Sequence, residues 1–249
     1  MTNFISIITA VHAPAAHHLG DAYRSLAAQK LPDGWDWQWV VQEDGETDAV
    51  VPHLPDDPRL SFGQGRHGRA GVARTLALSR AAGKYVKVLD ADDQLTPGAL
   101  ARDLVALTQP GVSWSTSRVL DLLPDGSTVG FDQDPPEGPI QRGEVLEHWR
   151  AHAYRAPVHP ATLAASRELV LALGGWMALP ASEDTGLLMA LNAVSTGWFT
   201  VETGLLYRKW SGQVTNDLAH THSGERDARI SVITARAEAL MAMDWRVGN

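Results

Sequence analysis

Residues 84–93, which read KYVKVLDADD, carry the clearest fold signal in the sequence. The β-branched and aliphatic run at 86–89 follows a glycine, and this pattern predicts a short buried strand. The strand ends abruptly in acid, so Asp90 and Asp92 lie at its carboxyl end, where open α/β sheets bind ligands. Two aspartates one residue apart can both turn toward one hard cation and the phosphate oxygens it carries. An isolated D-x-D is also common in ordinary acidic turns, so the motif needs support from the rest of the chain.

Composition excludes several kinds of site and partner. The 249 residues suffice for one large domain or two small ones. The formal charge of −8 argues against nucleic acid or an anionic membrane as the main partner. Because there is no cysteine, disulfides, thiolate metal sites and cysteine nucleophiles are excluded. The N-terminus lacks the basic region of a signal peptide, and no window is apolar enough for a membrane span, so we expect a cytoplasmic protein. The sequence leaves open whether the protein forms a homo-oligomer.

The pattern before and after this stretch is that of alternating strands and helices. Strands at 4–10 and 35–41 flank a helix at 17–30, which predicts a parallel, doubly wound sheet. The second strand also runs into acid, at Glu43 and Asp44. Further predicted strands are 59–62, 85–89, 112–119, 127–131 and 198–207, with a strand entry at 157–164. Further predicted helices are 69–82, 96–108, 144–153, 166–173, 185–194 and 225–245.

Local signals refine these predictions at three places. Thr96 is expected to cap the helix at 96–108, and Ser182 the helix at 185–194. Residues 132–143 are rich in proline, glycine and acid, which predicts a mobile loop and the one candidate boundary between two halves.

Residues 63–68 read GQGRHG, a literal G-x-G-x-x-G. With the helix, strand and acid that follow, this is a near fit to a dinucleotide fingerprint, so an NAD-type dehydrogenase is one alternative. We disfavour it because the preceding strand is short, the motif does not open the fold, and a ribose needs only one acid. Arg66, Arg69 and Arg74 are expected instead to bring positive charge toward a phosphate, or to lie on a solvated helix face.

Four stretches, taken in order, resemble the inverting family 2 glycosyltransferases of the GT-A fold. They are residues 40–48 (VVQEDGETD), residues 71–93, the turn Gly174-Gly175-Trp176 and the pair Glu183-Asp184. Each is short, but their order and separations over roughly residues 4 to 215 make the set fairly specific. The departures from the family pattern are Glu43, Glu46 and Thr75, and they concern donor-base contacts more than reaction type.

The resemblance implies an α/β protein of GT-A fold: an open, mostly parallel Rossmann-like sheet flanked by helices, with a C-terminal helix. It implies a single glycosyltransferase domain over residues 1–222. Residues 1–110 would form the nucleotide-sugar-binding half and residues 111–222 the acceptor-binding half. Residues 223–249 would be a C-terminal helical extension.

The implied function is metal-dependent, inverting transfer of a sugar from a UDP, GDP or dTDP sugar to a hydroxyl acceptor, with Mn²⁺ or Mg²⁺ as cofactor. Asp184 would be the catalytic base, beside Glu183. The metal would be held by Asp90 and Asp92, with His220 and His222 as further ligands or plain loop residues. The expected donor-binding residues are Thr9, Ala10, Val11, His12, Asp44, Arg66, Arg74, Asp90, Ala91, Asp92, Arg208 and Trp210. The expected acceptor-binding residues are His159 and Trp176, although Trp176 suits core packing equally well.

Other classes fit the residues less well. A haloacid-dehalogenase-like phosphatase wants its D-x-D on the first strand, with Thr or Val where Gln94 stands. A calcium loop beginning at Asp90 would have Leu95 at its Gly position and Ala101 at its Glu position. A non-catalytic sugar-binding module would keep the pocket without turnover, and stays an alternative.

Overall fold

The computed structural model describes residues 3–213 and 223–246. Over these residues one ten-stranded sheet has the order β3-β2-β1-β4-β9-β6-β10-β5, with β7 beside β6 and β8 beside β10. The strands are β1 Asn3–Val11, β2 Trp35–Asp44, β3 Leu60–Gly65, β4 Tyr85–Val88, β5 Gln94–Leu95, β6 Val112–Leu122, β7 Thr128–Val129, β8 Gly138–Ile140, β9 Ala164–Ser166 and β10 Thr196–Arg208.

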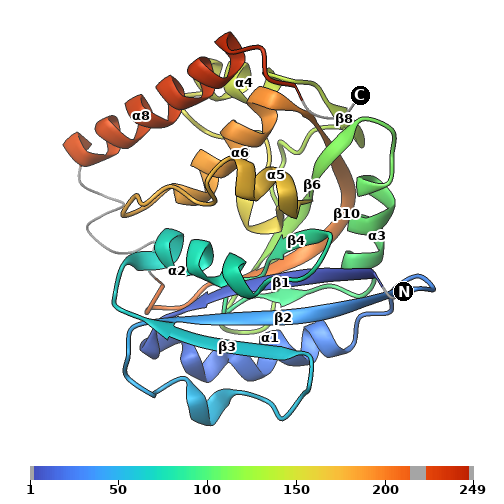
Figure 1. The fold of residues 1–249 in the computed structure, drawn as a ribbon, viewed down its shortest axis with the longest axis vertical. Helices are drawn as coiled ribbons and strands as arrows, with labels where there is room; N and C mark the ends of the chain where they lie inside the picture. Colours follow the sequence, from blue (N-terminus) through green and yellow to red (C-terminus); the bar gives the residue numbers. More distant parts are fainter. Residues whose placement is uncertain (1–2, 214–222, 247–249) are drawn as a thin grey trace.

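Helices cover both faces of this sheet (Figure 1). The α-helices are α1 Leu19–Ala27, α2 Arg69–Ala77, α3 Ala99–Leu107, α4 Glu144–Ala151, α5 Arg167–Ala172, α6 Glu183–Val194 and α8 Ser223–Ala242. Short 3₁₀ helices are η1 Ala13–His18, η2 Val51–His53, η3 Leu78–Arg80 and η4 Pro160–Thr162. The structure therefore confirms the predicted α/β class, with a curled open sheet between helices.

The N-terminal half of the sheet is parallel, as predicted. β1 pairs in parallel with β2 and β4, and β2 pairs in parallel with β3. Ile5, Ile7 and Ile8 of β1 are fully buried because α1 and α2 cover opposite faces, which explains the continuous apolar run. The side chains form two cores, one around α1 and α3 and one around α5 and α6. The carboxyl ends of β1, β2 and β4 consequently meet at one edge.

The C-terminal half of the sheet is mixed. β9 inserts between β4 and β6 and runs antiparallel to both, whereas β6 and β10 are parallel. β7 lies within the predicted strand at 127–131 and pairs antiparallel with β6. The prediction of a structureless loop over 132–143 was wrong in part, because β8 lies within it and pairs antiparallel with β10. The sheet is continuous across residue 110, so the two predicted halves share one framework.

Of the two predicted helix caps, Thr96 was wrong, whereas Ser182 does stand at the N-cap position of α6. The helix expected at 96–108 begins at Ala99, after Gly98 in the left-handed region at φ 76°. The Thr96 hydroxyl does not cap it, because this hydroxyl donates to the Thr203 carbonyl of β10. Ser182 precedes α6 but makes no side-chain capping bond, and its own φ is 63°.

The predicted C-terminal helix is present as α8 and packs against α6 (Figure 1). Ile233 and Ala237 of α8 are each 1% exposed and belong to the core around α6. The helix therefore contributes to the core around α5 and α6. Its status as a C-terminal extension of the glycosyltransferase domain stays a prediction. Within the described part of the chain, none of the helices has the length and apolarity needed to cross a membrane.

Candidate functional site

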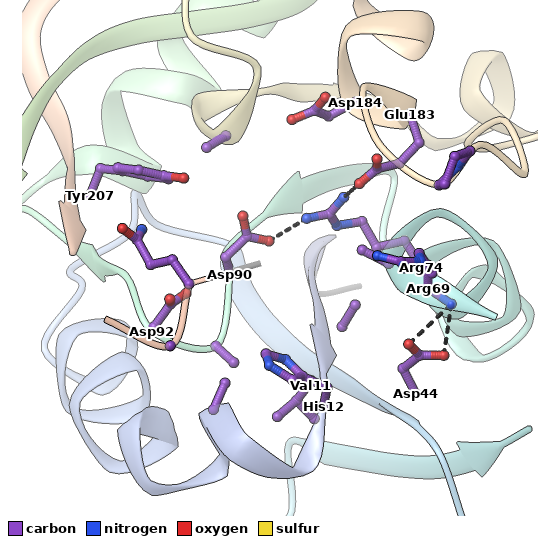
Figure 2. Close-up of a pocket in the computed structure, with 18 of the residues that line it drawn as sticks. Val11, His12, Asp44, Arg69, Arg74, Asp90, Asp92, Glu183, Asp184 and Tyr207 are labelled. Atoms are coloured by element: carbon purple, nitrogen blue, oxygen red, sulfur yellow. Dashed lines mark hydrogen bonds and ion pairs between the residues drawn. The ribbon is translucent and has the colours of Figure 1, made fainter. Parts of the chain in front are cut away.

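A cavity of about 560 Å³ opens at the carboxyl ends of β1, β2 and β4 (Figure 2). Residues from the loops after these strands, from α2, from the start of α6 and from the end of β10 surround it. Twelve of the residues predicted for the site line it: Ala10, Val11, His12, Asp44, Arg69, Arg74, Asp90, Ala91, Asp92, His159, Glu183 and Asp184. The topology thus brings together side chains that are distant in sequence.

Asp90 and Asp92 form the acidic floor of this cavity. They lie in a turn just after β4, closed by a hydrogen bond from the Asp93 amide to the Asp90 carbonyl. Asp92 Oδ2 accepts a hydrogen bond of 2.6 Å from the Trp210 indole. Burial and the nearby Asp90 raise the pKa of Asp92, and the Trp210 hydrogen bond partly offsets this effect. A positive charge close to Asp92 would therefore be strongly stabilising.

Arg74 of α2 joins the two acidic sides of the cavity. Its Nη2 lies 2.5 Å from Asp90 Oδ1, and its Nη1 lies 2.6 Å from Glu183 Oε1. The side chain is only 5% exposed. Burial alone would lower the pKa of Arg74, but the carboxylates of Asp90, Glu183 and Asp184 raise it above its ordinary value. Arg74 therefore stays charged and holds Asp90 and Glu183 in place.

The pair Glu183-Asp184 begins α6, and its two carboxylates differ in their contacts. Glu183 is tied to Arg74, whereas Asp184 Oδ1 accepts a 2.6 Å hydrogen bond from the amide of the next residue, Thr185. Burial and the neighbouring Asp184 raise the pKa of Glu183, and Arg74 acts in the opposite sense. Figure 2 shows Asp184 on the wall across the cavity from Asp92. Of the two acids, Asp184 is the one whose contacts leave it available to a substrate.

Asp44, at the end of β2, caps α2 from the opposite side of the cavity. Its Oδ1 accepts hydrogen bonds from the amides of Gly68 at 2.6 Å and Arg69 at 3.0 Å. Its Oδ2 lies 3.0 Å from His67 Nδ1. In a dinucleotide fold these helix amides would receive the pyrophosphate. Here a carboxylate already satisfies them, which argues against the dehydrogenase alternative.

His159 and Tyr207 lie next to each other in the cavity lining. His159 precedes η4, where its Nδ1 accepts a 3.3 Å hydrogen bond from the Ala161 amide. Its ring centroid lies 5.0 Å from that of Tyr207. Burial lowers the pKa of His159, outweighing the nearby carboxylates of Asp184 and Asp90, so the imidazole is neutral at pH 7. This part of the lining offers uncharged polar groups to a ligand.

Residues 208–213 form a strap over the acidic floor. Arg208 donates from Nε to the Asp92 carbonyl at 2.7 Å and from Nη2 to Asp21 at 2.6 Å. Its backbone amide donates to Asp93 Oδ1 at 2.9 Å. Trp210 lies edge-on to His18, with ring centroids 4.8 Å apart. Arg208 and Trp210 do not line the cavity themselves, but they fix the turn that carries Asp92.

Besides Arg208 and Trp210, three predicted site residues lie outside the cavity lining. Thr9 is fully buried, and its hydroxyl donates to the Leu89 carbonyl and accepts from the Trp39 indole. Arg66 is exposed. Trp176 is 4% exposed and packs in the hydrophobic core. Of its two predicted roles, acceptor binding and core packing, the structure therefore supports core packing. His220 and His222 lie outside the described residues.

The sequence analysis missed several lining residues, among them His67, Tyr207 and Gln213. It also missed a buried ion pair beneath the site. Lys87 Nζ lies 2.8 Å from Asp103 Oδ2 and donates to the Thr162 carbonyl of η4 at 2.6 Å. A lysine within the apolar run of β4 was the available signal for this pair, because such a residue needs a buried partner.

The fit of a divalent cation depends on the oxygen ligands available. Among residues 3–213 and 223–246 there is no group of three or more His, Asp or Glu side chains suited to a metal. Asp90 and Asp92 are nevertheless hard oxygen donors, and Mg²⁺ commonly binds through one or two carboxylates plus substrate phosphates and waters. Five carboxylates line the cavity against two arginines. These residues fit a divalent cation that arrives with a phosphorylated ligand.

The sequence is similar to those of known glycosyltransferases. Residues 6–116 match the family model described as glycosyl transferase family 2. TuaG of Bacillus subtilis (strain 168), provisionally assigned as a teichuronic acid biosynthesis glycosyltransferase, is 28% identical over 145 residues. That match spans 55% of this chain and 56% of TuaG.

The fold is also similar to that of solved structures. The crystal structure of S. aureus TarS 1–349 in complex with UDP-GlcNAc superposes with a TM-score of 0.70 at 17% identity, covering 98% of this chain and 71% of that one. The complex of the same protein with UDP gives a TM-score of 0.64 at 15% identity, covering 98% and 70%. At these identities the likeness shows the fold.

Proposed function

We propose that this chain is a family 2 glycosyltransferase of GT-A fold, and that it transfers a sugar from a nucleoside diphosphate to an acceptor hydroxyl with inversion. The observation that carries the proposal is the arrangement of Asp90 and Asp92 across one cavity from Asp184. One wall suits a cation-bound diphosphate and the other presents a carboxylate to an acceptor. The TarS complexes with UDP and UDP-GlcNAc support a nucleotide sugar as donor.

Asp90 and Asp92 would hold Mn²⁺ or Mg²⁺ together with the donor's phosphates. When bound, the cation would neutralise the charge that develops on the departing diphosphate. The cavity lining has more carboxylates than arginines, so a diphosphate without a cation would be repelled there. This excess of negative charge supports a requirement for the cation. His12 and Asp44, at the nucleotide end of the cavity, would contact the donor's nucleoside.

Asp184 would act as the general base. The acceptor oxygen forms a bond to the anomeric carbon as the bond from that carbon to the phosphate oxygen breaks, and the hydroxyl proton passes to Asp184. The nucleoside diphosphate leaves from the opposite face, which gives inversion without an enzyme nucleophile. Glu183 would not act as the base, because its carboxylate is paired with the Arg74 guanidinium at 2.6 Å. His159 would orient the acceptor.

A thermal-shift panel of UDP, GDP, dTDP and NAD, each with and without Mn²⁺, tests the proposal. One diphosphate at about 100 times its Kd should stabilise the protein by roughly 2.7 kcal/mol, or about 5 to 10 °C. This shift should require Mn²⁺ and disappear in Asp92→Asn. Glu202→Gln is the matched control, because it also removes one negative charge but lies at an exposed position outside the cavity lining. It should keep the Mn²⁺-dependent shift.

Two outcomes would contradict the proposal. Stabilisation by NAD without metal would support the dehydrogenase, despite the capping of α2 by Asp44. Binding of a nucleotide sugar without transfer to any hydroxyl acceptor, or to water, would indicate a sugar-binding module.

A further inference from the structure

A segment without regular secondary structure leads to the proposed base. It comprises residues 177–182, which belong to neither a helix nor a strand and join the turn after α5 to the start of α6. Pro180 and Ser182 of this segment line the cavity together with Glu183 and Asp184. The position of Asp184 in the cavity therefore depends on what holds the segment in place.

Two consecutive residues of α2 hold the residues that flank the segment. Arg74 pairs with Glu183, on its C-terminal side, at 2.6 Å (Figure 2). Thr75 holds its N-terminal side, because the Thr75 hydroxyl donates to the Trp176 carbonyl at 3.2 Å and accepts from the Trp176 amide at 3.0 Å. One side chain thus bonds to both backbone polar groups of Trp176.

The packing of α2 against this region is close because two glycines lie at the contact. A Cβ at Gly71 would lie 2.5 Å from the Met177 carbonyl oxygen and 3.0 Å from the Glu183 Cβ. A Cβ at Gly175 would lie 2.8 Å from Thr75 Oγ1, and the φ of this glycine is 74°. Only a residue without a side chain permits this approach and this backbone conformation together. The two glycines thus allow the close contact that the Thr75 hydrogen bonds require.

Thr75 is placed to act on the segment and not on a ligand. It does not line the cavity, although its neighbour Arg74 does. In the sequence Thr75 is a departure from the family pattern that concerns donor-base contacts. In the structure its hydroxyl instead contacts the backbone that leads to Asp184.

We infer that Thr75 is a positioning residue for Asp184, and that its hydroxyl fixes the segment that brings the base to the acceptor. The inference rests on the proposed function. Without this hydroxyl, the Trp176 side of the segment loses two hydrogen bonds to α2, and the carboxylate of Asp184 is held less closely. A displacement of about 1 Å in a reacting group can lower the rate by about a hundredfold.

Thr75→Val tests this role, because valine keeps the shape of threonine and removes the hydroxyl. The assay would follow release of the nucleoside diphosphate from UDP-N-acetylglucosamine with Mn²⁺, to water or to a supplied hydroxyl acceptor. The same sugar on GDP or dTDP replaces it if the thermal-shift panel selects that nucleotide. We expect kcat to fall roughly ten- to a hundredfold while the donor Kd stays within about threefold. Thr75→Ser keeps the hydroxyl and should retain most of the wild-type kcat.

Combination with Asp184→Asn separates positioning from a purely structural role. Because no base then remains to be displaced, Thr75→Val should lower the residual kcat by less than about threefold in this background. A general structural defect would lower kcat by the same factor in both backgrounds. Circular dichroism would check that each variant is folded at the assay temperature.

Thr108→Val is the matched control. It makes the same substitution at an exposed position at the end of α3, where the lost hydroxyl donates to the Val105 carbonyl at 2.9 Å. Thr108 lies outside the cavity lining, so kcat and donor Kd should both stay at their wild-type values.

The failures of the two proposals are distinguishable. If the wild-type protein with Mn²⁺ transfers no sugar from a nucleoside diphosphate, either to an acceptor or to water, the proposed function fails and the inference fails with it. If the wild-type protein does transfer sugar but Thr75→Val keeps kcat within threefold of the wild-type value, the inference is overturned while the glycosyltransferase proposal stands. The same holds if Thr75→Val lowers kcat equally with and without the Asp184 carboxylate.

Discussion

Replacing Asp184 by asparagine separates catalysis from donor binding. Asp184 is the acid at the start of α6 that is not paired with Arg74, and its Oδ1 accepts a 2.6 Å hydrogen bond from the Thr185 amide. The asparagine side-chain oxygen can accept the same bond, so the local backbone should be preserved. The variant removes only the charge and the ability to take a proton.

The expected effects on rate and on stability differ greatly in size. A positioned general base contributes about 10²- to 10⁴-fold, so kcat should fall by that factor, or about 2.7 to 5.4 kcal/mol of transition-state stabilisation. A negative charge in the first turn of a helix is worth about 0.3 to 1 kcal/mol. The melting temperature should therefore fall by no more than about 4 °C.

Steady-state release of the nucleoside diphosphate would measure kcat, and isothermal titration would measure the donor Kd. We expect the donor Kd to stay within about threefold, because Asp184 lies across the cavity from Asp92. Glu183→Gln is the matched comparison: it breaks a buried ion pair, so it should cost about 3 to 5 kcal/mol of unfolding free energy. A kcat for Asp184→Asn within threefold of the wild-type value would refute the assignment of the base.

Three further predictions concern other parts of the chain. Asp92→Asn should abolish turnover together with the Mn²⁺-dependent part of nucleotide affinity, measured by titration with and without metal; unchanged metal-linked affinity would place the cation elsewhere. Asp103→Ala should destabilise the fold by about 3 to 5 kcal/mol in urea unfolding, because it leaves the Lys87 ammonium buried and unpaired, whereas replacing both residues by apolar ones of similar volume should cost much less. Burial, with smaller contributions from neighbouring positive groups, lowers the pKa of His18 from 6.5 to about 4. Because the unfolded chain takes up this proton first as the pH falls, the unfolding free energy should decrease between pH 6.5 and 4. His18→Phe should show a shallower decrease in urea unfolding over the same pH range, and an identical slope would count against this account.

Much of the framework could be predicted from local sequence. The sequences of β1, β2 and β4 contain continuous apolar runs because both faces of each strand are covered. In the structure, consecutive residues of these strands are buried accordingly. The carboxyl ends of parallel neighbours lie at one edge, so Asp44 and Asp90 could be expected near each other. The resemblance to family 2 glycosyltransferases supplied the reaction and the candidate base, which local patterns alone did not.

Helix starts and the mixed half of the sheet were harder to predict. Thr96 has the side chain of a good cap, but its hydroxyl donates to a carbonyl of β10, 107 positions away. The short strands β8 and β9 have no clear hydrophobic period of their own, since each is only three residues long. Their pairing depends on which longer strands leave an edge open.

Local sequence was enough to place acids at the ends of buried strands, because neighbouring residues show both that a strand is buried and where it ends. Which of those acids is paired depends instead on tertiary packing. Arg74 reaches Asp90, 16 positions away, and Glu183, 109 positions away, in the same buried space. Such pairings follow from how helices pack on the sheet, and they distinguish Asp184 from its neighbour as the acid free to meet a substrate.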